Sequence, residues 1–163
     1  MNNHHETYPS IQICSLQTAR ETDYSIYDGL ITIEDSLEDN PLRIDNDLCP
    51  QLVLCFDDIS LPVDDYILPQ KKHVEKALEF TEEIGDGSLI IHCVAGISRS
   101  SAIALAVIAK SLGIGKEEEA IKELQILNPY CLPNKLVVRL TDEILGHEMK
   151  LYNVTIELID YHY

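Results

Sequence analysis

Basic residues are scarce in this chain of 163 residues. Its 12 Lys and Arg stand against 28 Asp and Glu, which gives a formal net charge of −16 at pH 7. Nucleic acids and anionic membranes bind to basic surfaces, so this charge argues against both as partners. It also repels a phosphorylated partner at long range, so a basic segment of a partner or a small substrate associates more easily. Any anionic substrate must be held by local groups.

Paired cysteines and long apolar runs are also missing. An odd number of cysteines with no Cys-x-x-Cys spacing indicates neither a disulfide framework nor a zinc site; they are Cys14, Cys49, Cys55, Cys93 and Cys131. We therefore expect no metal, no cofactor and a reducing compartment, the cytoplasm. The longest apolar run, 102–109, is far below the roughly 20 residues that span a bilayer. Residues 1–6 have neither the basic start nor the apolar run of a secretion signal.

What is present is a short loop between two apolar segments. The apolar run 89–91 leads into His92 and Cys93, and an apolar helix is expected from about Ser98. The residues between Cys93 and Arg99 are few enough for their N–H groups to curl around one tetrahedral anion; they are Val94, Ala95, Gly96, Ile97 and Ser98. Gly96 lets the backbone approach closely, and the helix points its positive end at the same anion. This pattern predicts a site that attacks phosphate.

Each residue type in this segment has a physical task. Converging N–H dipoles and a nearby guanidinium favour the thiolate of Cys93, which makes it a nucleophile. Arg99 presents a planar fork that matches two phosphoryl oxygens, and lysine could not replace it geometrically. His92 and Ser100 flank the pair, where they orient the loop or donate a hydrogen bond to sulfur.

The run from His92 to Ser100 resembles the signature loop of the cysteine-dependent protein tyrosine phosphatases, and its part from Ala95 onward is closest to the dual-specificity branch. Asn128-Pro129 and Pro133-Asn134 resemble the segment that in this branch places an Asn, here Asn134, against the loop. The run 56–59 is similar to one that precedes the loop in small predicted tyrosine phosphatases of bacteria. The resemblance covers about residues 52–145.

The resemblance implies a mechanism in two displacements. Cys93 attacks phosphorus in line, and water then hydrolyses the cysteinyl phosphate. One carboxyl group that alternates between acid and base serves both steps. In this family it is an Asp on a loop before the signature. The candidates are Asp57, Asp58, Asp64 and Asp65.

Two arguments choose differently among these carboxylates. Residues 52–56 read as a buried strand, and an Asp at its carboxyl end lies where such sheets hold ligands, which favours Asp58 and then Asp57. Asp64 lies 29 positions before Cys93, nearer the usual dual-specificity spacing than the 35 of Asp58. We choose Asp58, which the bacterial resemblance also supports, with Asp64 next.

The expected activity is hydrolysis of phosphomonoesters, most of all phosphotyrosine in protein, with phosphoserine and phosphothreonine also considered. The additional basic residues of lipid-directed relatives are absent between Cys93 and Arg99. Two alternatives stay open. One is a phosphatase of a phosphoinositide, an RNA 5′-phosphate or a small ester. The other is a non-catalytic adaptor that binds phosphate with the intact loop.

The order of apolar segments predicts an α/β fold, with a central, largely parallel sheet of four or five strands flanked by helices on both faces, as in phosphotyrosine phosphatases. Strands are expected near 11–16, 30–33, 52–56 and 89–93, and helices near 70–84, 98–112, 116–127 and 134–146.

Residues 1–163 should form one domain, with 1–8 mobile and 147–163 as a tail that packs on it. Residues 35–47 read as an exposed acidic loop, with a place at the border of the substrate cleft as the alternative. Cys55, on a strand expected to neighbour that of Cys93, is a candidate for its redox protection, although a structural role is the simpler interpretation.

Overall fold

The computed structural model describes residues 8–161, so all but the last residue of the segment expected to be mobile, 1–8, lies outside the described residues. The elements, in chain order, are β1 (Ser10–Cys14), α1 (Leu16–Glu21), a 3-10 turn (Tyr24–Ile26), β2 (Gly29–Glu34), β3 (Gln51–Cys55), α2 (Lys71–Ile84), β4 (Ser88–His92), α3 (Arg99–Leu112), α4 (Glu117–Leu127), α5 (Lys135–Leu145) and α6 (Lys150–Leu158).

The strands form one parallel sheet in the order β1-β4-β2-β3. Leu89, Ile90 and Ile91 in β4 are fully buried, as expected for an inner strand of a parallel sheet covered on both faces. Cys14 at the end of β1 lies opposite His92 at the end of β4. Because all strands run the same way, their carboxyl ends meet at one edge of the sheet. The expected α/β class and parallel sheet are confirmed, and among residues 8–161 the sheet has four strands.

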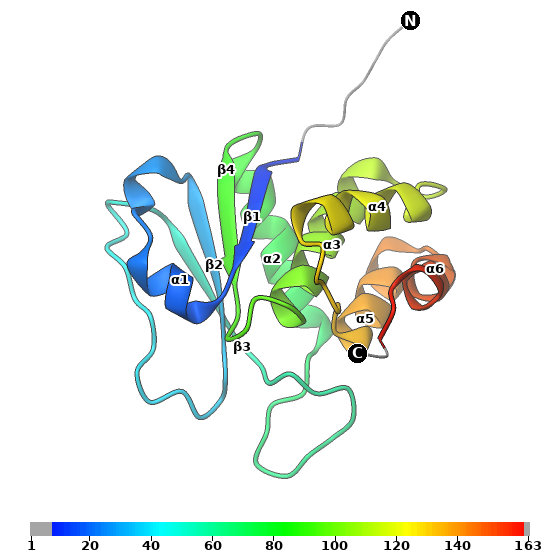
Figure 1. Cartoon of the computed structure of the whole chain (residues 1–163), viewed down its shortest axis with the longest axis horizontal. Helices are drawn as coiled ribbons and strands as arrows, with labels where there is room; N and C mark the ends of the chain where they lie inside the picture. The colour runs from blue at the N-terminus through cyan, green and yellow to red at the C-terminus, as the bar shows by residue number, and fades with distance from the viewer. Residues whose placement is uncertain (1–7, 162–163) are drawn as a thin grey trace, which may run out of the picture.

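The two faces of the sheet are covered differently. Ile31 and Ile91 point into the large core, where α2 and α3 pack. Leu30 and Ile90, one position earlier along each strand, point into a smaller core with Ala19 of α1. In Figure 1, α3 to α6 gather on the side away from α1. Long helices therefore cover one face, whereas the other has the short α1, the 3-10 turn and the segment that leads to β3.

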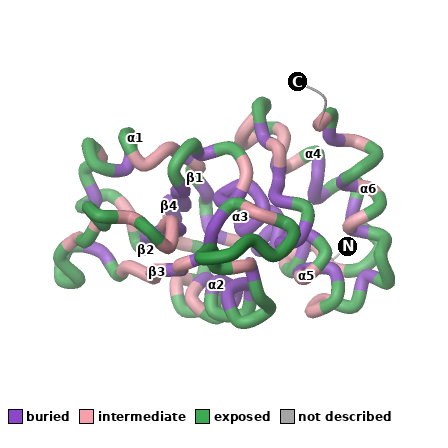
Figure 2. Tube along the Cα trace, turned by 90° about the horizontal axis from the view of Figure 1, so that it is seen from below, coloured by how far each residue is buried: buried purple, intermediate pink, exposed green. Residues whose placement is uncertain are grey.

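Helix α3 is the central element of the large core. Every residue from Arg99 to Ala109 in it is buried, and Figure 2 shows this stretch surrounded by other elements. Small side chains such as Ala102, Ala104 and Ala106 let its neighbours approach closely on all sides. The start of this helix, which follows the candidate phosphate loop, is therefore held rigidly.

The carboxyl-terminal segment docks on the helices. Helix α6 packs against α4 and α5. The buried carboxylate of Asp142 in α5 accepts hydrogen bonds from the backbone N–H groups of Met149 (2.8 Å) and Tyr152 (3.0 Å), which fixes the start of α6. Tyr161 then donates a hydrogen bond from its hydroxyl to the carbonyl of Pro133 (2.7 Å) and so lies beside the candidate site.

Candidate active site

The site lies where the carboxyl ends of all four strands meet. Cys93 follows β4 directly, and the backbone N–H of Leu16, after β1, donates to the carbonyl of Val94 (3.0 Å). The chain after β2 contributes Asp35, and the chain after β3 contributes Phe56 and Asp58. Residues that are far apart in the sequence are thus brought to one edge of the sheet.

The loop from Cys93 to Ser98 has its carbonyl groups turned outward and held. The carbonyls of Gly96, Ile97 and Ser98 accept hydrogen bonds from Asn128 Nδ2 (2.9 Å), Leu132 N (3.0 Å) and Asn134 N (3.2 Å). Within residues 8–161 no acceptor is found for the backbone N–H groups of four loop residues, which are Val94, Ala95, Ile97 and Ser98. A ring of unpaired N–H groups is a nest for an anion.

The thiol of Cys93 lies at the base of this nest. It is 2 % exposed, and its Sγ accepts a hydrogen bond from the N–H of Gly96 (3.2 Å). Ser100 Oγ lies 3.2 Å from the same sulfur. Both groups can donate to a thiolate, so the arrangement stabilises the charged, nucleophilic form.

Gly96 is the one loop position where a side chain would collide with the backbone. Its φ is +73°, and an added Cβ would lie 2.6 Å from the carbonyl carbon of Cys14 and 2.7 Å from Ser15 N. These are atoms of main chain and cannot rotate away. The close approach of the loop to the end of β1 therefore requires glycine.

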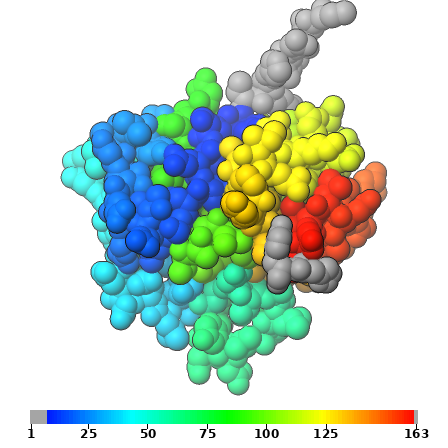
Figure 3. Space-filling model, in the orientation of Figure 1, coloured from blue at the N-terminus to red at the C-terminus, as the bar shows by residue number. Residues whose placement is uncertain are grey.

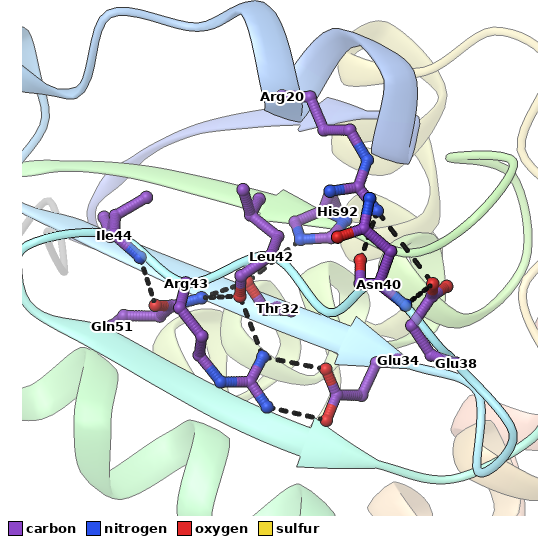
Figure 4. A network of polar contacts seen from close by, with 10 residues as sticks. All are labelled: Arg20, Thr32, Glu34, Glu38, Asn40, Leu42, Arg43, Ile44, Gln51 and His92. Atoms are coloured by element: carbon purple, nitrogen blue, oxygen red, sulfur yellow. Dashed lines mark hydrogen bonds and ion pairs between the residues drawn. The ribbon is translucent and has the colours of Figure 1, made fainter.

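His92 is a buried connection between the loop and the sheet. Its Nδ1 lies 3.0 Å from the carbonyl of Cys93, which can only accept, so Nδ1 carries the proton. Its Nε2 then accepts from the hydroxyl of Thr32 (2.9 Å), which in turn accepts from Gln51 Nε2 (2.9 Å). Burial lowers the pKa of His92, which keeps the ring neutral. Figure 4 shows this chain of contacts continuing from Gln51 to Leu42.

The guanidinium of Arg99 is 4 % exposed and reaches back under the loop. Its Nη1 donates to the carbonyl of Phe56 (2.9 Å) and forms an ion pair with Asp35 Oδ1 (2.6 Å). Its Nε is buried and has no partner among the described residues. Arg99 also lines the cavity that contains Cys93, so part of its fork is available to a ligand there.

The four candidate acids differ sharply in position. Asp58 lines the cavity of Cys93, and its Oδ1 accepts hydrogen bonds from Ser98 Oγ (2.7 Å) and Asn134 Nδ2 (2.9 Å). Asp64 and Asp65 are exposed and do not line this cavity. Asn134 also caps α5 through Val137 N (3.0 Å), so one amide orients both the helix and Asp58.

Asp57 is buried, and its carboxylate is hydrogen-bonded to the backbone. It is 3 % exposed, and its carboxylate accepts from the backbone N–H groups of Ser36 (3.0 Å) and Ile67 (2.7 Å). Burial alone would raise the pKa of Asp57, but hydrogen bonds from Ser36 and Ile67 and the charge of Arg99 outweigh it and lower the pKa. Its oxygens are occupied in joining two loops.

The cavity over the loop has a volume of about 720 Å³. One wall is apolar, with Leu132, Pro133 and Tyr161. Lys135 Nζ lies 4.5 Å from the centre of the Tyr161 ring and is a second cation at the rim. In Figure 3 the green segment that follows β4 reaches the surface between the blue amino-terminal elements and the yellow segment after α4.

Sequence reasoning missed several residues that the fold brings to the site. The sequence pattern indicates a solvated loop for Asp35, with the border of the cleft only as the alternative, and a tail for Tyr161. Asn128 was noted only as part of a motif, although its Nδ2 contacts both Gly96 O and Ser101 Oγ (3.1 Å). The signal for Asn128 was its place in the Asn-Pro pair, but no local pattern connects Asp35 or Tyr161 with Cys93.

The placement of Cys55 next to Cys93 was wrong. Strand β2 lies between β3 and β4, so Cys55 is two strand spacings, roughly 9–10 Å, from the strand of Cys93. A disulfide needs Cα atoms within about 7 Å, so the two thiols cannot pair in this fold. Cys14, on the adjacent β1, is the closer thiol, and burial together with the charge of Cys93 raises the pKa of Cys14 to about 11.

Between residues 8 and 161, no group of three or more His, Cys, Asp or Glu side chains is arranged to hold a metal ion. No helix in the same part of the chain is both long and apolar enough to cross a membrane.

Comparison with known proteins finds dual specificity phosphatases among both the sequence relatives and the solved structures. No family model matches the chain. It is 32% identical over 84 residues to human dual specificity protein phosphatase 16 (50% of this chain, 12% of the relative) and 39% identical over 67 residues to mouse dual specificity protein phosphatase 15 (38% and 28%). The chain thus spans less than a third of these relatives. The solved structure of DUSP15 matches with a TM-score of 0.62 at 21% identity over 93% of this chain and 94% of that one, which shows the same fold.

Proposed function

Since the chain is a dual-specificity-like member of the cysteine-dependent protein tyrosine phosphatase superfamily, we propose that it hydrolyses phosphomonoesters through a cysteinyl-phosphate intermediate. One observation carries this proposal. A buried thiol lies under a loop whose carbonyls are held outward and whose N–H groups are unpaired, with a buried guanidinium beside it. Such a loop fits the three free oxygens of a phosphoryl group.

In the first step, Cys93 Sγ attacks phosphorus in line, and the bond from phosphorus to the ester oxygen breaks. Loop N–H groups and Arg99 stabilise the charge on the equatorial oxygens in the transition state. Asp58, in its protonated form, gives the leaving oxygen a proton. Its position in the cavity, held by Ser98 and Asn134, supports this role over those of Asp57, Asp64 and Asp65.

In the second step, Asp58 takes a proton from water, which attacks the cysteinyl phosphate. The sulfur–phosphorus bond breaks, inorganic phosphate forms, and Cys93 leaves as a thiolate. Hydrogen bonds from Gly96 N and Ser100 Oγ stabilise that thiolate, so sulfur is a good leaving group. No metal takes part in this scheme.

The proposed substrate is a protein that carries phosphotyrosine, with phosphoserine and phosphothreonine as further substrates. The apolar wall of Leu132, Pro133 and Tyr161 suits an aromatic ring beside the phosphate. The curated relatives are named dual specificity protein phosphatases, which supports a protein substrate. The cytoplasm is the proposed compartment, because Cys93 must stay reduced and all five cysteines are free thiols.

Hydrolysis of an aryl phosphate tests the activity. The wild type should turn over with a chelator present, and Cys93→Ser should be inactive. Cys131→Ser, which removes another buried thiol, is the matched control and should keep activity. Turnover that persists in Cys93→Ser would exclude the cysteinyl intermediate. Phosphate binding by a folded wild type that hydrolyses no phosphotyrosine, phosphoserine, phosphoinositide or RNA 5′-phosphate substrate would instead indicate an adaptor.

A further inference from the structure

The two oxygen atoms that accept from Arg99 both lie at the same corner of its guanidinium. Both Asp35 Oδ1 (2.6 Å) and Phe56 O (2.9 Å) contact Nη1. Nε, on the opposite edge, is buried without a partner among the described residues. A buried donor with no acceptor is costly, and it indicates that a ligand completes the site.

The shape of the fork determines which edge a phosphate can use. Nε and Nη2 form one edge with two parallel N–H groups, which matches two oxygens of a phosphoryl group. Because Nη1 is held at the other corner, this edge is the one that stays free. A guanidinium without the contact to Asp35 could rotate about its terminal torsions and present a different pair of N–H groups.

The segment that carries Asp35 is itself fixed. Its neighbour Ser36 donates from N to the buried carboxylate of Asp57 (3.0 Å), and Glu34 forms a two-pronged ion pair with Arg43 (2.9 and 3.0 Å). Figure 4 shows Arg43 and Glu34 beside the contacts that hold Leu42 to Gln51. Asp35 is thus anchored on both sides, so its carboxylate has a defined place next to Arg99.

We propose that Asp35 is a positioning residue, which holds Nη1 of Arg99 so that the edge formed by Nε and Nη2 faces the phosphoryl oxygens. This inference rests on the proposed function for its substrate but concerns phosphate binding alone. It predicts that phosphate binds more weakly when the carboxylate is removed. The opposite effect, tighter binding, is the outcome if Asp35 competes with phosphate for Arg99.

The test measures binding of inorganic phosphate by calorimetry in the Cys93→Ser background, where no turnover is needed. Asp35→Ala should weaken phosphate binding about tenfold. Asp35→Asn should lose at most about threefold, because the amide oxygen still accepts from Nη1. Asp39→Ala, which removes an exposed carboxylate from the same segment without touching Arg99, is the matched control and should bind phosphate unchanged.

Steady-state kinetics add a readout that general damage to the fold would not give. In the active enzyme, Asp35→Ala should raise KM for an aryl phosphate about tenfold, with recovery in Asp35→Asn. Because 42% of the Asp35 side chain is exposed, the variant should fold, and Asp35→Ser provides a second truncation. Unchanged or tighter phosphate binding in the truncated variants overturns the proposal. Absence of turnover in the wild type overturns the phosphatase function and leaves the binding result valid.

Discussion

At the scale of single residues, the candidate site depends on side chains that fix the positions of other side chains. Asp58 is held by Ser98 and by Asn134, and Asn134 also caps α5. The same carboxylate therefore contacts the phosphate loop and the segment behind it. This arrangement keeps the carboxyl group that we propose as the acid at the cavity that contains Cys93.

Replacing Asp58 tests its role through the leaving group. Asp58→Asn should lower kcat/KM for a phosphotyrosine peptide about 100-fold, because kcat/KM reports the first displacement and a phenoxide leaves slowly without a proton. The loss should be much smaller for a nitrophenyl phosphate, whose leaving group needs no proton. Steady-state rates on both substrates check this. Asp64→Asn is the control, and equal losses for the two substrates would contradict the acid role.

Gly96 gives a second test at this scale. Gly96→Ala places a methyl group against the backbone of Cys14 at a positive φ, so the loop must move. We expect a loss of stability of roughly 1–3 kcal/mol and much weaker phosphate binding. Gly113→Ala, also at a positive φ but with nothing near the added Cβ, separates the backbone strain from the collision. Urea unfolding and phosphate titration measure the two effects.

The sequence predicts candidate site residues where they lie close together along the chain. The spacing of Cys93 and Arg99 and the glycine between them suffice to predict a phosphate loop. Asp35 could not be predicted, because its contact with Arg99 depends on β2 lying beside β4 in the sheet, which no spacing reveals. The choice of Asp58 over Asp57 followed strand position, whereas the buried contacts of Asp57 with Ser36 and Ile67 are visible only in the fold.

At the scale of elements, the segment between α4 and α5 acts as a support for the phosphate loop. Asn128, Leu132 and Asn134 donate to three successive loop carbonyls. Because a peptide group points its N–H opposite to its C=O, these contacts turn the N–H groups toward the cavity. The segment between α4 and α5 thus fixes the orientation of the peptide groups in the nest.

Truncation of Asn128 tests this support. Asn128→Ala removes the hydrogen bonds to Gly96 O and Ser101 Oγ, which should destabilise the fold by about 1–2 kcal/mol and raise KM for an aryl phosphate severalfold. Asn153→Ala, an exposed position on α6, is the control and should change neither quantity. Wild-type KM in Asn128→Ala would show that the loop keeps its shape without this contact.

Long elements were easier to predict than short ones. The four strands and the helices α2 to α5 follow from apolar runs and periodicity. Helix α1 has six residues, too few for a periodic pattern, and its signal was Ser15, whose side chain accepts from Thr18 N (3.2 Å). Helix α6 was missed because its start is fixed by the distant carboxylate of Asp142.

At the scale of the whole molecule, the charge of −16 should affect association. A basic phosphopeptide should react with a higher kcat/KM at low salt than an acidic one of equal length. The difference should shrink as ionic strength rises to about 0.1 M and beyond, since the Debye length is then about 10 Å or less. Rates for both peptides over a salt series check this, and parallel salt dependence would contradict a long-range effect.

Acid should weaken the fold through His73, which packs on Phe56. Burial, with the charges of Lys72 and Lys76, lowers the pKa of His73 from 6.5 to about 4. Below about pH 6.5 the unfolded chain therefore binds a proton at His73, whereas the folded chain binds it only below about pH 4. The free energy of unfolding falls as the pH falls from about 6.5 to about 4. Lowering the pH from about 7 to 5 should reduce the free energy of unfolding by roughly 2 kcal/mol through His73 alone.

Urea unfolding at both pH values measures that loss. His73→Gln keeps an acceptor for the N–H of Gln70 and has no proton to take up, so its stability should fall less on acidification than that of the wild type. Burial also lowers the pKa of His92, which adds a smaller change of the same sign and should persist in the variant. An equal loss of stability in the wild type and in His73→Gln would show that a group other than His73 titrates.

The central claim is that phosphate passes through Cys93, and trapping that intermediate tests it most directly. Enzyme is mixed with an aryl phosphate, quenched in acid within milliseconds, and mapped by peptide mass spectrometry. We predict one phosphate on the peptide that contains Cys93 and none in Cys93→Ser. A phosphorylated residue elsewhere, or wild-type turnover with Cys93 never modified, would contradict the account.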